Sequence, residues 1–300
     1  MKRVSLKMTN RIGFRFIPKM LLIFLAIVTG SCSNDDDQPT TAITEISQEI
    51  KNLIYFKGDE KAATVLITVS GGPGTVIGSD TVDDFSPFLN PKGILTVAVH
   101  QAQTLNPEIL AGNDITLAQA SSFDAESTEM LGKVIAYFKN QGRTVYVVGL
   151  SFGSFVTQDL IAKKGINSAD KYLILAGRLD MNEIVWQAAA EGKTSYFENG
   201  ITPIINPEPN PDVKERNLER IGAGFVMNRY TQLFNSIESL CNLTYIYGEV
   251  DQAVGALTAN EIQFLESKNA NVIKGPGDHD DTLNNFLERG FEEAFDITVQ

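Results

Sequence analysis

A serine flanked by glycines is the feature of this sequence best suited to chemistry. The stretch "VYVVGLSFGS" places Ser151 between Gly149 and Gly153, directly after a run of β-forming residues. A serine in the pattern Gly-x-Ser-x-Gly, where a buried strand turns into a helix, sits on a strained turn that exposes its hydroxyl. Glycines suit such a turn because they have no Cβ to collide with it. The pattern predicts a nucleophilic hydroxyl at Ser151 and an oxyanion-binding backbone N–H at Phe152.

A second glycine-rich turn, "TVSGGPG", follows the apolar run at residues 65–69. A turn at the end of a strand can offer another backbone N–H to the same oxyanion, and here Gly71 or Gly72 would supply it. Neither glycine-rich turn ends in Gly-Lys-Ser/Thr, so the sequence disfavours a phosphate-binding loop.

A histidine and a carboxylate are needed to activate such a serine. His279 lies in "GPGDHDD" after the last apolar run, and Asp251 follows another run in "YIYGEVDQAVG". We interpret His279 as the base and Asp251 as the group that orients its ring, with Glu249 as the competing acid. The other histidine, His100, ends an early apolar run and is interpreted as a plain strand-end residue, with pocket lining as the alternative. The acids beside His279 also allow a metal site, but adjacent residues rarely converge on one ion, so no metal is predicted.

Taken in order, these motifs resemble those of the α/β-hydrolases, in which nucleophile, acid and histidine follow one another along the chain. The resemblance spans residues 49–295 and implies a Ser151–His279–Asp251 triad that cleaves an ester or amide without a cofactor. The turn "SGGPG" is similar to the His-Gly-Gly-Pro-Gly loop of the prolyl iminopeptidase branch. Ser70 replaces the histidine of that loop, which bears on peptidase activity more than on oxyanion binding.

The rest of the chain alternates strand-like and helix-like segments. Runs that are apolar on both faces predict parallel strands covered by helices, at residues 62–70, 93–100, 144–150, 171–177, 243–249 and 270–275. Amphipathic segments predict helices at residues 124–140, 154–164, 258–267 and 282–295. This alternation predicts an α/β fold with a doubly wound, mostly parallel sheet.

The alternation stops at about residues 178–240, which hold the only tryptophan and a proline cluster. Apolar residues at helical spacing predict a mostly helical insertion there. The resemblance implies that this insertion is a cap domain that closes over the site and sets specificity. Its acids Glu183, Glu191 and Glu198 could attract a free amino terminus.

The N-terminus has the pattern of an export signal. Residues 1–31 combine six basic residues with a short apolar run, at residues 20–28, that is too short to span a bilayer. "TGSC" resembles a bacterial lipobox, which implies lipidation at Cys32. "SNDDD" resembles the export signals of surface lipoproteins from the Bacteroidetes, although a solvated linker would look the same. We predict a tether at residues 32–48 and a domain at residues 49–300. We also predict a location in the cell envelope, with a lipid anchor in the outer membrane, and the protein on either the outer surface or the periplasmic side.

The formal net charge of −12 argues against nucleic acid as a partner, because phosphate binding needs clustered Lys and Arg. Two functions fit the motifs. The first is a serine hydrolase acting on a small ester or a short peptide. The second is a surface-anchored ligand-binding protein on a catalytically silent hydrolase scaffold, since a fold alone does not fix function.

Overall fold

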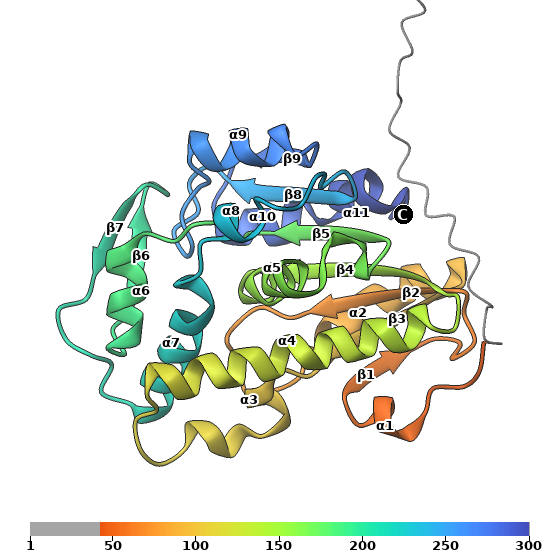
Figure 1. Ribbon diagram of the computed structural model, residues 1–300, viewed down its shortest axis with the longest axis horizontal. Coiled ribbons are helices and arrows are strands. Elements are labelled where there is room, and N and C mark those ends of the chain that lie inside the picture. The colour runs from red at the N-terminus through yellow and green to blue at the C-terminus, as the bar shows by residue number, and fades with distance from the viewer. Residues whose placement is uncertain (1–42, 300) are drawn as a thin grey trace, which may run out of the picture. The chain divides into compact units, whose positions relative to one another are not determined.

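A seven-stranded sheet forms the centre of the molecule in the computed structural model, which describes residues 43–299 (Figure 1). The strands lie in the order β1-β3-β2-β4-β5-β8-β9, with β1 antiparallel to β3 and every other pair parallel. Their bounds are Ile54–Lys57 (β1), Thr64–Val69 (β2), Ile94–Val99 (β3), Thr144–Leu150 (β4), Lys171–Leu175 (β5), Leu243–Gly248 (β8) and Asn271–Gly275 (β9). The predicted α/β class and parallel sheet are confirmed.

The six predicted strands all form, with ends that differ by two residues at most. The sequence did not reveal β1, because this short edge strand buries only its first residue fully and so lacks a continuous apolar run. The predicted signal peptide, Cys32 and tether residues 32–42 lie outside the described residues. Within residues 43–299, no helix combines the length and the apolar character needed to cross a bilayer.

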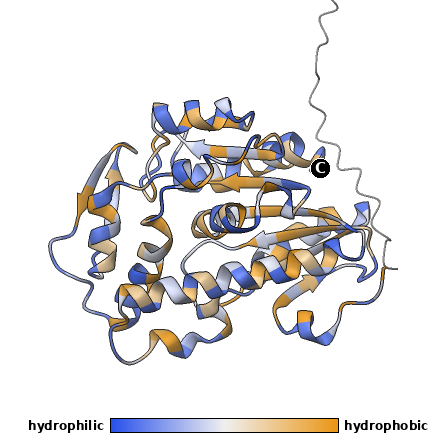
Figure 2. Ribbon diagram, in the orientation of Figure 1, coloured by the Kyte–Doolittle hydropathy of each residue, from blue (hydrophilic) through white to orange (hydrophobic). Residues whose placement is uncertain are grey.

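Helices cover both faces of the sheet. One face packs against α4 (Leu117–Lys139), α5 (Phe152–Lys164) and α9 (Ala259–Ser267), and the other against α2 (Ser79–Leu89) and α11 (Leu287–Phe295). Figure 2 shows hydrophobic and hydrophilic residues alternating along α4, as expected for a helix with one face in the core.

Two helix predictions need correction. The segment predicted as one helix at 282–295 is two helices, α10 (His279–Asn285) and α11, separated at Phe286. The helix α4 begins seven residues before the predicted start at 124, because Thr116 and Gln119 form a capping box there. Short helical turns complete the fold: α1 (Gln48–Lys51), α3 (Ala102–Leu105), and the 3₁₀ turns η1 (Asn90–Lys92), η2 (Pro107–Leu110) and η3 (Ile166–Ser168).

The insertion between β5 and β8 contains helices and one β-hairpin. Its elements are α6 (Glu183–Ala190), β6 (Ser195–Glu198), β7 (Thr202–Ile205), α7 (Val213–Val226) and α8 (Tyr230–Leu233). The hairpin was not predicted, although Asn199 and Gly200 at its tip both have positive φ, and Asn-Gly is a strong hairpin signal. Helix α7 packs on both α4 and α6, so this helix joins the insertion to the core (Figure 1).

Candidate active site

Ser151 occupies the tight turn between β4 and α5. Its backbone has φ 50° and ψ −115°, a conformation that non-glycine residues rarely adopt. A Cβ at Gly153 would collide with the carbonyl of Val69, and one at Gly149 would come within 2.6 Å of Oγ1 of Thr157 and 2.8 Å of the Gly153 carbonyl oxygen. The two glycines are therefore required because strand β2 and helix α5 approach the turn closely. The strained backbone lifts the Ser151 hydroxyl out of the carboxyl edge of the sheet.

The three side chains singled out in the sequence are joined by hydrogen bonds. Nε2 of His279 lies 2.8 Å from Oγ of Ser151, and Nδ1 of His279 lies 2.7 Å from Oδ2 of Asp251. Because the carboxylate can only accept at this site, Nδ1–H donates to it and Nε2 is left to accept the serine proton. This chain of contacts can transfer a proton from a serine hydroxyl to an imidazole.

Asp251 is held by the loop that follows β8, residues 249–257, which we call the acid loop. The side chain is 1% exposed. Its Oδ1 accepts backbone N–H groups from Ala253, at 2.8 Å, and Val254, at 2.9 Å, which leaves Oδ2 for the imidazole. Both oxygens of a buried carboxylate are thus hydrogen-bonded, as a charged group away from water requires.

His279 is the first residue of α10, and its acidic neighbours serve that helix. Asp278 is the N-cap, and it forms a capping box with Asp281. The Asp281 N–H bonded to Asp278 lowers the pKa of that carboxyl. Asp278 and Asp281 therefore serve to cap the helix, while Asp280 and Asp281 are exposed. Within the described residues, no group of three or more potential metal ligands occurs.

The competing residues make other contacts. Glu249 pairs with Lys274 at 2.9 Å. His100 directly follows β3, its Nδ1 lies 3.0 Å from Oγ1 of Thr104, and burial lowers the pKa of its ring. It is not among the residues that line the cavity at Ser151, so His100 is a strand-end residue, as interpreted from the sequence, and the alternative of pocket lining is not supported.

The turn after β2 lies against the serine. A Cβ placed on Gly71 would approach Cβ of Ser151 to 3.3 Å, and Gly72 lines the same cavity as Ser151 and Phe152. A hydrogen bond holds the start of this turn: the side-chain amide of Gln101 donates to the carbonyl of Ser70 at 3.0 Å. The turn after β2 and the turn that carries Ser151 therefore lie against each other at one end of the cavity.

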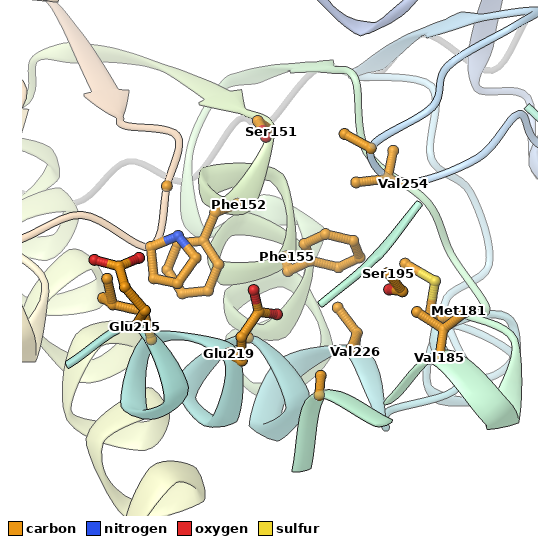
Figure 3. Close-up of a pocket in the computed structure, with 16 residues that line it drawn as sticks. Ser151, Phe152, Phe155, Met181, Val185, Ser195, Glu215, Glu219, Val226 and Val254 are labelled. Atoms are coloured by element: carbon orange, nitrogen blue, oxygen red, sulfur yellow. The ribbon is translucent and has the colours of Figure 1, made fainter. Parts of the chain in front are cut away.

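A cavity of about 370 Å³ opens in front of Ser151 under the cap (Figure 3). One wall is apolar and includes Phe155, Met181 and Val226. Figure 3 shows Glu215 and Glu219 extending from α7 into the cavity, on the side of Phe152.

The carboxyl of Glu219 is half-buried, and its burial together with the charge of Glu215 raises its pKa to about 7. The acids named from the sequence, Glu183, Glu191 and Glu198, are not among the residues that line this cavity. The spacing of Glu215 and Glu219, four residues apart in a helix, was visible in the sequence, but the side to which that helix face turns was not.

Comparisons with known proteins identify the fold. No protein-family model matches the sequence, and neither does any curated protein. The solved structure of MGS-M2, an alpha/beta hydrolase enzyme from a deep-sea metagenome library, has a TM-score of 0.53 at 12% identity, covering 82% of this chain and 95% of that one.

A structure of the metagenome-derived lipolytic enzymes LipS and LipT gives a TM-score of 0.51 at 13% identity, covering 82% and 96%. A thermostable carboxyl esterase from Bacillus coagulans gives 0.50 at 12% identity, covering 80% and 89%. The chain therefore has the α/β-hydrolase fold.

Proposed function

We propose that this protein is a serine hydrolase that cleaves a small ester or amide through an acyl-enzyme. The observation that carries the proposal is the hydrogen-bonded series from Ser151 through His279 to Asp251 at the mouth of a cavity. A strained serine, an imidazole in the right tautomer and a buried carboxylate are the parts that nucleophilic catalysis by serine requires.

The reaction follows from these contacts. Oγ of Ser151 attacks the substrate carbonyl carbon while Nε2 of His279 takes the hydroxyl proton, and the carbonyl π electrons move onto oxygen. The N–H of Phe152 and one from Gly71 or Gly72 stabilise that oxyanion. His279 then gives its proton to the leaving alcohol or amine as the bond to it breaks. Water repeats the sequence on the acyl-enzyme and releases the acid.

Two glutamates favour a substrate with a positive charge. The only charged side chains that line the cavity within the described part of the chain are Glu215 and Glu219. The exposed carboxylate of Glu215 and the half-buried carboxylate of Glu219 would together attract a protonated amine and repel an acid. Aminoacyl esters and short peptides with a free amino terminus are therefore the second candidate substrates, beside neutral esters that use only the apolar wall.

The N-terminal sequence supports a location in the cell envelope, with the protein held at the outer membrane by acyl chains on Cys32. We expect cells that express the whole chain to incorporate labelled palmitate into it, and Cys32→Ser to abolish this labelling. Wild-type protein that stays unlabelled would refute the lipid anchor.

The decisive experiment compares wild type with Ser151→Ala on p-nitrophenyl esters and aminoacyl nitroanilides. We expect turnover to fall by about four to six orders of magnitude while the protein stays folded. A fluorophosphonate probe should label wild type at Ser151. Tight ligand binding without labelling would instead support the ligand-binding alternative, and turnover that survives in Ser151→Ala would refute the mechanism.

A further inference from the structure

We propose that the cap hairpin β6–β7 positions the acid loop, and that Gly200 at its tip is a positioning residue for Asp251. The inference rests on the proposed triad, because it concerns how the carboxylate of that triad is held. It gives the cap a part in aligning the catalytic residues, in addition to covering the cavity.

Two backbone hydrogen bonds join the hairpin to the acid loop. The N–H of Phe197, in β6, donates to the carbonyl of Gln252 at 2.8 Å, and the N–H of Ala256 donates to the carbonyl of Gly200 at 2.8 Å. These bonds lie on either side of Ala253 and Val254, the two residues whose N–H groups bind Oδ1 of Asp251. The hairpin therefore fixes both ends of the segment that orients the carboxylate.

Gly200 is packed directly against the residues before Asp251. A Cβ at Gly200 would lie 2.9 Å from Cα of Val250 and 3.0 Å from the carbonyl oxygen of Glu249. These are backbone atoms, so they cannot move aside as a flexible side chain can. Its φ of +70° also favours glycine. Any larger residue at this position must push the hairpin and the acid loop apart.

The other end of the acid loop meets side chains, those of Arg178 and of Phe197 in the hairpin. A Cβ at Gly255, which has a φ of +79°, would lie 2.5 Å from the guanidinium of Arg178 and 3.0 Å from the ring of Phe197. The Phe197 ring is 1% exposed and lies under that guanidinium, with 5.3 Å between the ring centroid and Cζ. Close packing therefore reinforces the two hydrogen bonds along the whole contact.

The cavity spans this contact. Ser195, in β6, and Ala253 and Val254, in the acid loop, all line the cavity in front of Ser151 (Ser195 and Val254 are labelled in Figure 3). A substrate in the cavity would touch both partners. Gly200 itself does not line the cavity, so its replacement would change the orientation of Asp251 while keeping every side chain of the cavity lining.

The test is Gly200→Ala, with Gly192→Ala as the matched control. Gly192 lies in the same cap with a φ of +76°, but the three atoms nearest to a Cβ there all belong to the side chain of Arg216, the first at 2.9 Å. Because small displacements in an active site are costly, we expect Gly200→Ala to lower kcat by about 100-fold with little change in KM. The control should change kcat by less than about threefold.

A double-substitution cycle shows whether Gly200 acts through Asp251. Added to Asp251→Ala, the Gly200 substitution should cost less than a further factor of about two, since the group it positions is already gone. A loss of about 100-fold in that background, or equal losses in Gly200→Ala and Gly192→Ala, would overturn the proposal.

Hydrogen exchange gives a readout that does not need activity. The amides of Ala253 and Val254 should exchange faster in Gly200→Ala than in Gly192→Ala, and unchanged protection would also overturn the proposal. If Ser151→Ala retains turnover, the proposed function fails, but exchange still decides the question about the hairpin. Should Gly200→Ala not fold, Gly255→Ala disturbs the same contact from the other side and is measured in the same way.

Discussion

Replacing Glu219 by glutamine should make the stability of this protein less dependent on pH. Burial raises the pKa of Glu219 from 4.5 to about 7 in the folded protein. The folded state then holds the proton more tightly than the unfolded state. The contribution of Glu219 to the free energy of unfolding is therefore fully present below about pH 4.5. It decreases as the pH rises toward about 7 and is constant above that.

The size of the effect follows from the shift. The rise in pKa to about 7 corresponds to at most about 3 kcal/mol, at about 1.36 kcal/mol per pH unit. The side chain is only half-buried, and solvent screening reduces this to about 1–3 kcal/mol. Glutamine has nearly the same shape as a protonated glutamate and carries no charge at any pH. Glu219→Gln should therefore not lose stability as the pH rises.

Urea unfolding at pH 5 and pH 8 measures the effect. The free energy of unfolding of Glu219→Gln minus that of wild type should be larger at pH 8 than at pH 5, by about 1–3 kcal/mol. Contributions from other titrating groups cancel in this difference. Glu215→Gln is the control, because Glu215 is exposed and acts mainly through its charge on Glu219. A difference that is the same at both pH values would refute the reasoning.

Two further predictions concern stability. Gly153→Ala should lower the melting temperature sharply or prevent folding, because the new methyl group would overlap the Val69 carbonyl, whereas Gly222→Ala in α7, which meets no atom within 4 Å, should raise it slightly. Asp124 is buried, neither of its oxygens has a hydrogen-bond partner, and burial raises its pKa well above its usual value. Asp124→Asn should therefore stabilise the protein more at pH 8 than at pH 5 in unfolding measurements, and the opposite order would contradict this assignment.

The core strands were predictable because each carries enough information alone. In β4, for example, Val145 and Val147 pack into the core on one side of the sheet and Val148 on the other. Gly149, one residue before the end of the strand, is needed for the tight turn at Ser151. The edge strand β1 and the hairpin β6–β7 are half-exposed, so their apolar content is too low to distinguish them from loops. The Asn-Gly pair was the remaining local signal for the hairpin.

The candidate site was predictable only in part, for a related reason. Ser151, Asp251 and His279 each follow a strand, and the carboxyl ends of parallel strands share one edge of a sheet, so their meeting could be inferred from order along the chain. Glu215 and Glu219 lie in the cap, where no strand fixes direction. Which face of their helix turns to the cavity depends on how α7 docks on α4, and that contact is not a local property of the sequence.

The two faces of helix α7 have different surroundings, one against α4 and the other toward the cavity. Against α4 the helix must leave no side chain at Gly224, because a Cβ there would collide with the carboxyl of Asp124. Toward the cavity it presents Glu219, which also costs stability when ionised. A helix that served packing alone would carry an apolar residue at position 219. Because raised carboxyl pKa values concentrate at functional sites, the raised pKa of Glu219 supports a binding role for the cavity-facing side of α7.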